Sequence, residues 1–96
     1  MFTLESIHAQ REAILEVAGR YGAYDVRVFG SVARGAARDE SDLDLVVRFE
    51  PGRSLFDHGG LLMDLRDLLG IKVDVVSEGA LTGRFGDEVR KEAVPL

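Results

Sequence analysis

Three aspartates stand out in this chain because their spacing allows their carboxylates to act together. Asp42 and Asp44 are two residues apart at the start of the segment 43–49, whose apolar residues alternate as in a strand. Side chains two apart on a strand project from one face, with Cα atoms roughly 7 Å apart. Asp74 lies on the polar face of a second expected strand, 71–77, so the three carboxylates converge if these strands are neighbours. Clustered carboxylates repel one another, and Mg²⁺ is the cation that best fits such oxygen ligands together with substrate phosphates.

A glycine–serine pair supplies a second part of the candidate site. Gly30 and Ser31 follow the expected strand 26–29 and open a small, polar segment, 31–38, that is consistent with one or two helical turns. A strand that ends in glycine and opens into a helix leaves backbone N–H groups free to bind phosphate oxygens. Glycine also lets a phosphate approach the backbone closely. The pair therefore predicts a phosphate-binding turn.

Three arginines near these motifs each have two readings. Arg34 and Arg38 fit charge-assisted hydrogen bonds to a leaving pyrophosphate about as well as they fit ordinary surface ion pairs. Arg48 shares the strand face of the aspartates and could reach the same patch, but a structural or interfacial role is the better expectation for it.

The remaining sequence predicts the elements that hold these residues. Apolar periodicity predicts a helix from Leu4 to about Gly19, which Thr3 can cap. A leucine stripe predicts a second helix that begins at Ser54 or Asp57, or just after the helix-disfavouring Gly59 and Gly60, and that Gly70 ends. A short helix is expected around 85–92, and the tail 93–96 could add an edge strand, where proline is tolerated.

These elements predict an α/β (α+β) fold with the order α-β-α-β-α-β-α. The sheet is expected to be small, single and mixed, with helices covering its apolar face, and residues 1–96 are expected to form one domain.

Composition excludes several classes of protein. The 96 residues carry a net charge of −5, which argues against direct nucleic-acid binding because such binding needs a basic footprint. The chain contains no cysteine, which excludes disulfides and thiolate metal sites. No apolar run approaches the length of a membrane span and no secretory signal is evident, so a cytoplasmic protein without a membrane partner is the expectation.

The motifs together resemble a known superfamily. Gly30-Ser31, a ten-residue spacer, an Asp-x-Asp strand and a later Asp form the pattern of the DNA polymerase β-like nucleotidyltransferases. The run GSVARGAARDESDLDLVV, followed by KVDVVSEGAL, is similar in particular to the minimal nucleotidyltransferases, the antitoxins of HEPN/MNT toxin–antitoxin pairs. The likeness extends from about Val26 to Leu81 and arguably to the ending KEAVPL.

The resemblance implies a nucleotidyltransferase fold and assigns a role to each motif residue. It makes Gly30 and Ser31 the nucleotide-phosphate turn, Asp42 and Asp44 metal ligands, and Asp74 a third carboxylate that contacts metal and activates the attacking hydroxyl. It implies two Mg²⁺ ions, ATP as substrate, and transfer of AMP to a tyrosine of a cognate HEPN toxin in a hetero-oligomer.

Two other functions stay open. The chain could be a binding module that blocks a toxin by contact alone, although three repelling carboxylates are unexpected in a pure binder. It could instead modify a small molecule, but 96 residues leave little protein for a second pocket.

Overall fold

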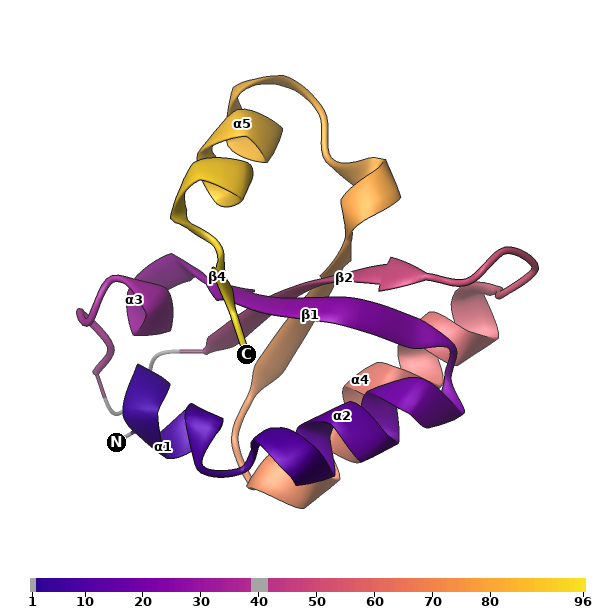
Figure 1. The fold of residues 1–96 in the computed structure, drawn as a ribbon, viewed down its shortest axis with the longest axis horizontal. Coiled ribbons are helices and arrows are strands. Elements are labelled where there is room, and N and C mark those ends of the chain that lie inside the picture. The colour runs from indigo at the N-terminus through magenta and orange to yellow at the C-terminus, as the bar shows by residue number, and fades with distance from the viewer. Residues whose placement is uncertain (1, 39–41) are drawn as a thin grey trace.

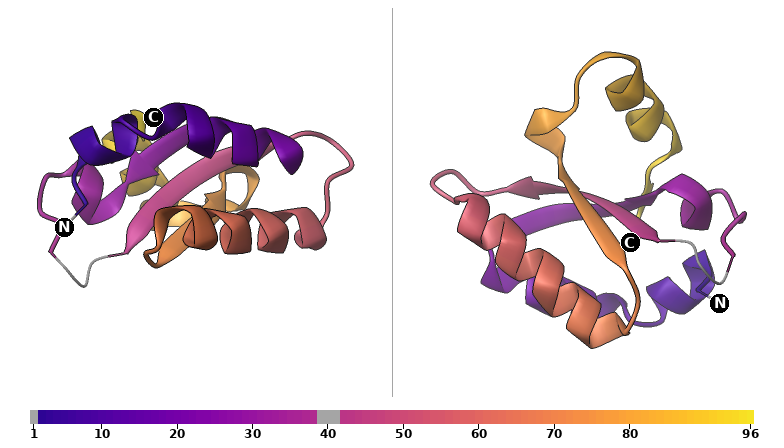
Figure 2. Two further views of the ribbon diagram at one scale, coloured as in Figure 1. Left: turned by 90° about the horizontal axis from the view of Figure 1, so that it is seen from below. Right: turned by 180° about the vertical axis from the view of Figure 1, so that it is seen from behind.

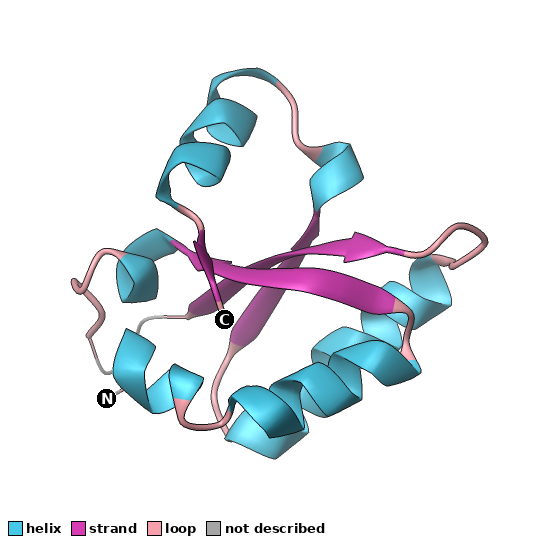
Figure 3. Ribbon diagram, viewed as in Figure 1, coloured by secondary structure: helices cyan, strands magenta, loops and turns pink. Residues whose placement is uncertain are grey.

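The computed structural model describes residues 2–38 and 42–96, and within them a four-stranded mixed sheet with helices on both sides (Figures 1 and 3). The strands lie in the spatial order β3-β2-β1-β4. β2 and β3 are parallel, whereas β1 is antiparallel to both β2 and β4. The strands are β1 (Ala23–Phe29), β2 (Leu43–Phe49), β3 (Val73–Ser77) and β4 (Val94–Pro95).

Five α-helices and one 3₁₀ turn precede or connect these strands in the described part of the chain. α4 is the crossover between the parallel strands β2 and β3, and α3 is a single turn directly after β1. The helices are α1 (Leu4–His8), α2 (Arg11–Arg20), α3 (Gly30–Ala33), α4 (Leu55–Leu69) and α5 (Gly83–Glu92), with the 3₁₀ turn η1 (Glu78–Ala80) after β3.

The main core lies between one face of the sheet and the helices α1, α2 and α4. Figure 2 shows these helices on the side of the sheet away from α5. Residues of one strand parity supply the sheet side of this core, as the alternation in the sequence predicts. The predicted mixed sheet is confirmed by the parallel and antiparallel strand pairs. The buried strand residues of this parity are Val26, Val28, Leu43, Leu45, Val47, Val73 and Val75, and the helices add Ile7, Ile14, Val17, Ala18, Leu61, Leu65 and Leu69. Ala23 of β1 is also buried in this core, and it precedes the register shift between Tyr24 and Arg27.

A second, smaller core lies on the opposite face, which also carries the aspartates. The expectation of helices on one face holds for α1, α2 and α4, but α5 packs on this other face. The reason is that Phe29 and Val46 form an apolar patch there, and Leu81 and Val89 bury it. Figure 1 shows α5 over this face of the sheet, and residues of α5 line one pocket together with Asp44 and Asp74.

The single N-terminal helix predicted from Leu4 to about Gly19 is wrong, because the chain breaks at Ala9–Gln10 into α1 and α2. A continuous helix would place Arg11 on the buried apolar stripe. After the break, the Arg11 Nε instead donates to the Leu96 carbonyl oxygen at 2.9 Å. The predicted cap is confirmed: the Thr3 hydroxyl accepts a hydrogen bond from the backbone of the first turn.

α4 begins at Leu55, directly after Ser54, which caps it, and not after the two glycines. Gly59 and Gly60 lie inside the helix. Gly60 is required by packing, because a Cβ there would collide with the ring of Tyr21 on the α2 side. Gly70 ends the helix in the left-handed conformation, as predicted.

The strands lie close to their predicted positions. β2 has the predicted bounds, β1 begins earlier than expected, and β3 begins two residues later. The tail forms the expected edge strand, with Pro95 beside Arg27 of β1. No helix in the described ranges is long and apolar enough to cross a membrane.

Candidate active site

Asp44 and Asp74 lie side by side on adjacent strands. The parallel pairing of β2 with β3 places Asp44 directly opposite Asp74, and both side chains project from the face that α5 partly covers. The convergence expected from strand parity is therefore present for this pair. Asp42 lies just before β2 at the same end of the sheet.

Gly30 closes one side of the Asp44 carboxylate. The antiparallel pairing sets Phe29, the last residue of β1, opposite Asp44, so the turn that follows β1 begins beside it. A Cβ at Gly30 would collide with the Asp44 carboxylate, and the backbone of Gly30 has φ +73°. Both the space and the left-handed conformation therefore require glycine here.

The pKa of Asp44 is raised to about 6, first by burial and then by repulsion from the neighbouring carboxylates Asp74, Asp42 and Glu92, while Arg34 opposes the rise. No salt bridge to Asp44 is found among the residues that the structure describes. The site thus concentrates negative charge around a poorly hydrated carboxylate, and a cation would relieve that repulsion.

The other two aspartates are each paired with a cation. Lys72 Nζ lies 3.6 Å from Asp42 Oδ2, and Arg66 Nη2 lies 3.7 Å from Asp74 Oδ1. Within residues 2–38 and 42–96, no three acidic or histidine side chains are gathered closely enough to hold one metal ion. The carboxylates share one patch, but they are not assembled into a preformed metal cage.

A pocket of about 500 Å³ opens over Asp44 and Asp74. Its walls differ in character. Its charged lining residues are Asp44, Asp74, Glu88, Glu92 and Arg34, its apolar lining residues are Phe29, Val76, Phe85 and Val89, and Gly30 also lines it. The pocket can therefore take a ligand with one apolar part and one part that needs polar partners.

The residues of the predicted phosphate turn differ in their relation to this pocket. Gly30 and Arg34 line it, whereas Arg38 is exposed beyond the end of α3 and is not among the lining residues. Ser31 is the second residue of α3 and is partly buried.

Glu92 is a site residue that the strand and turn motifs did not reveal. Its Oε1 accepts a hydrogen bond from the Gly30 backbone N–H at 2.7 Å, and its Oε2 lies 3.1 Å from Arg34 Nη1. Glu92 is 62 residues away from Gly30 and comes from α5, so periodicity along the chain carries no signal for this contact.

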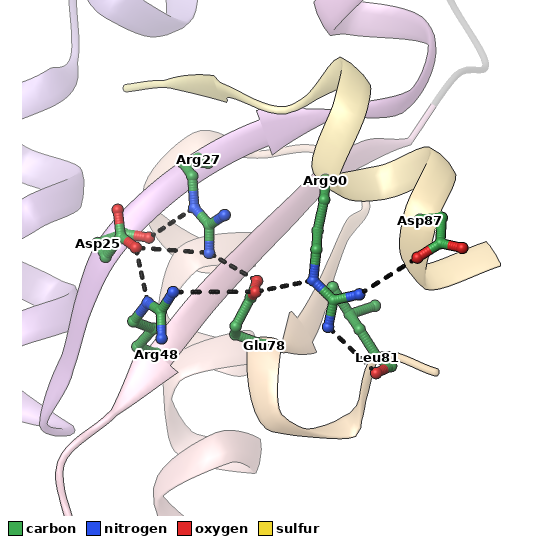
Figure 4. A network of polar contacts seen from close by, with 7 residues as sticks. All are labelled: Asp25, Arg27, Arg48, Glu78, Leu81, Asp87 and Arg90. Atoms are coloured by element: carbon green, nitrogen blue, oxygen red, sulfur yellow. Dashed lines mark hydrogen bonds and ion pairs between the residues drawn. The ribbon is translucent and has the colours of Figure 1, made fainter. Parts of the chain in front are cut away.

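Arg48 belongs to a separate polar network and not to the acidic patch. Figure 4 shows it beside Asp25 and Glu78, with Nε 2.8 Å from Asp25 Oδ2. Glu78 also accepts from Arg27 at 2.8 Å and from Arg90 at 3.1 Å, and these hydrogen bonds hold the pKa of Glu78 below its ordinary value. The network ties β1, β2 and η1 to α5 and fixes the helix that carries Glu92.

A mixed sheet that presents paired aspartates beside a glycine turn fits the fold of a nucleotidyltransferase. The sequence matches the family described as "Nucleotidyltransferase domain" over residues 11–94, and the chain therefore belongs to that family. It is 38% identical to the protein adenylyltransferase MntA of Thermococcus cleftensis, over 98% of this chain and 96% of the relative.

Solved structures agree with this assignment. A candidate minimal nucleotidyltransferase is 55% identical and superposes with a TM-score of 0.87, covering 99% of this chain and 97% of the other. Two toxin–antitoxin complexes are more distant. One contains AMP-PNP; it is 19% identical with a TM-score of 0.75, and the match covers 88% of this chain and 69% of the other. The other is a complex of a tri-AMPylated HEPN toxin of Shewanella oneidensis with an MNT antitoxin; it is 16% identical with a TM-score of 0.69, and the match covers 92% of this chain and 69% of the other. The last two likenesses show the fold. Together the comparisons confirm the resemblance drawn from the sequence motifs.

Proposed function

We propose that this chain is a Mg²⁺-dependent adenylyltransferase that acts as an antitoxin, transferring AMP from ATP to a hydroxyl, expected to be a tyrosine, of a cognate HEPN toxin. One observation carries the proposal. Asp44 lies opposite Asp74 and against Gly30, in a pocket that has both acidic and apolar walls. The MntA relative is a protein adenylyltransferase, which supports a protein as acceptor, and the tri-AMPylated HEPN toxin in the MNT complex supports a toxin.

The donor set fits a divalent metal ion. Asp42, Asp44 and Asp74 offer only oxygen ligands, as Mg²⁺ prefers, and the raised pKa of Asp44 reflects burial first and then repulsion, which a cation relieves. Mg²⁺ would compete with Lys72 and Arg66 for two of these carboxylates. When bound, Mg²⁺ neutralises phosphate charge and polarises the phosphoryl oxygens.

Different residues at the pocket bind the phosphates and the base of ATP. Gly30 and Ser31 supply the turn for the phosphates, and Arg34 adds a positive charge at the same edge. Phe85 is 58% exposed and stands edge-on to Phe29, so an apolar surface is available for the flat base.

The transfer requires one proton acceptor. The acceptor hydroxyl oxygen forms a bond to the α-phosphorus, the bond from that phosphorus to the bridging oxygen breaks, and pyrophosphate leaves with the electron pair. Asp74, which lines the pocket and is 47% exposed, takes the hydroxyl proton. Positioning and charge stabilisation supply the rest of the rate enhancement.

Co-expression with the toxin separates transfer from blocking by contact. We expect the wild type to protect cells and the double variant Asp42→Ala/Asp44→Ala to lose protection. Pull-down of the variant with the toxin is the control that it still folds and binds. Full protection by the variant would instead favour a binding module without chemistry.

Melting curves test the metal and the nucleotide without a partner. A ligand that binds only the folded chain raises its melting temperature by mass action. Millimolar Mg²⁺ with ATP should therefore raise the Tm of the wild type more than that of Asp42→Ala. Equal shifts would contradict metal binding at Asp42.

A further inference from the structure

The phosphate turn is already occupied by a side chain of the same protein. The carboxylate of Glu92 accepts the Gly30 N–H at 2.7 Å and lies 3.1 Å from the guanidinium of Arg34. These two groups, a backbone amide and an arginine on one edge of the pocket, are the donors that the proposed function gives to the nucleotide phosphates.

The two uses of these donors exclude each other. Gly30 has one N–H proton, and a short hydrogen bond to Glu92 directs it at the carboxylate. A carboxylate also carries the charge sign of a phosphate and offers similar acceptor oxygens, so it fits the turn for the same physical reason. Glu92 further adds negative charge beside Asp44, where a triphosphate would enter.

The side chain of Glu92 can move away from Gly30 and Arg34 although its backbone is fixed. Glu92 is the last residue of α5, and the neighbouring turn is held by buried Val89 and by Arg90, which pairs with Glu78 and donates to the Leu81 carbonyl oxygen. The Glu92 side chain itself is 29% exposed, so rotation about its own bonds brings the carboxylate into water without moving the helix.

We propose that Glu92 is an internal competitor for the phosphate turn, which ATP displaces when it binds, so that this residue sets the nucleotide affinity of the site. The inference rests on the proposed function and adds a determinant of substrate affinity to it. In the free protein the Glu92 carboxylate satisfies Gly30 and Arg34; in the complex the phosphate takes both donors and the carboxylate turns to solvent.

Calorimetric titration of the full chain with Mg²⁺-ATP tests this competition. Glu92→Ala removes the competitor, and we expect its Kd to fall about three- to ten-fold, the value of one typical net intramolecular hydrogen bond. Asp87→Asn removes the same unit charge from α5 at a side chain that is 74% exposed, and should leave the Kd unchanged. Equal or weaker binding by Glu92→Ala would overturn the proposal.

Glu92→Asp separates the contact from its charge. Aspartate keeps the charge but is one methylene shorter, which draws its carboxylate away from Gly30. Competition by contact predicts tighter ATP binding for Glu92→Asp as well. If Glu92→Asp binds ATP with wild-type affinity, the tighter binding by Glu92→Ala comes from the loss of general charge repulsion, and the proposal is overturned.

Hydrogen exchange at the Gly30 amide supplies a readout that does not involve the nucleotide. We expect this amide to be protected in the wild type and to exchange faster in Glu92→Ala, with the protection restored by Mg²⁺-ATP. If the wild type binds ATP but Glu92→Ala binds no tighter, the competition fails and the proposed function stands. If neither protein binds ATP, both fail.

Discussion

Asp44 lies directly opposite Asp74 in the parallel pairing of β2 with β3, and the resulting repulsion acts on a partly buried carboxylate. The folded protein binds the Asp44 proton more tightly than the unfolded chain does. Stability from this group is therefore present at pH below about 4 and is lost as the pH rises through about 6.

Asp44→Asn should consequently stabilise the protein at pH 7.5 in EDTA, by about 1–2 kcal/mol after allowing for screening by water. The gain should shrink to a small fraction at pH 4, because wild-type Asp44 is then protonated in the folded protein and about half protonated in the unfolded chain. Thermal melts at the two pH values measure it, with the exposed Asp67→Asn as control. A gain that does not change with pH would contradict this origin.

The contact of Gly30 with Asp44 can be separated from backbone strain by a matched pair of glycines. Gly30 and Gly35 both have φ near +70°, but a Cβ at Gly35 meets nothing within 4 Å. Gly35→Ala should cost about 1–2 kcal/mol from strain alone. Gly30→Ala should cost at least about 1 kcal/mol more and should weaken ATP binding. If denaturant unfolding shows equal losses of unfolding free energy for the two variants, the Asp44 carboxylate moves away from the new Cβ at no cost, which would contradict this contact.

The two glycines inside α4 should respond in opposite directions to alanine. Gly59→Ala should stabilise the protein by about 0.5–1 kcal/mol, because alanine favours the helix and no atom lies within 4 Å of the new Cβ. Gly60→Ala should destabilise it by about 1–3 kcal/mol, since the new methyl meets the ring of Tyr21. Chemical denaturation of both variants measures the difference, and stabilisation by both would contradict the packing described here.

Glu78 should show the pH dependence opposite to that of Asp44. Hydrogen bonds from Arg27 and Arg90 hold its pKa low, so its stabilisation is present above the ordinary glutamate pKa and is lost as the pH falls through the lowered value. Glu78→Gln should lower the Tm by about 5 °C or more at pH 7 and by less in acid. The exposed pair of Glu50 with Arg53 is the matched control, and an equal effect of Glu50→Gln would argue against a special role for the network.

Local patterns predicted much of this fold because they depend on neighbouring residues. Alternation gave the face of every core residue in 43–49, and Gly70 marked the end of α4 as expected. The break at Ala9–Gln10 was not predicted in this way; it comes with a contact of Arg11 with Leu96, 85 residues away, for which local periodicity carries no signal.

The candidate site was only partly visible for the same reason. Strand parity brought Asp44 and Asp74 together correctly, because parallel register follows from the crossover. The side of the sheet on which α5 packs depends on a patch formed by β1 and β2 together. Glu92 and Phe85 line the pocket because α5 packs on that face, and no local sequence pattern marks either residue as part of the site.

Transfer of labelled AMP tests the central claim most directly. The purified chain, Mg²⁺, ATP labelled in the α-phosphate and a candidate HEPN partner protein are incubated, in parallel with Asp44→Ala and with Asp67→Ala as control. We predict label on the HEPN protein with the wild type and the control, and at least about 100-fold less with Asp44→Ala. Equal labelling by Asp44→Ala would contradict the assignment of the active site to this carboxylate.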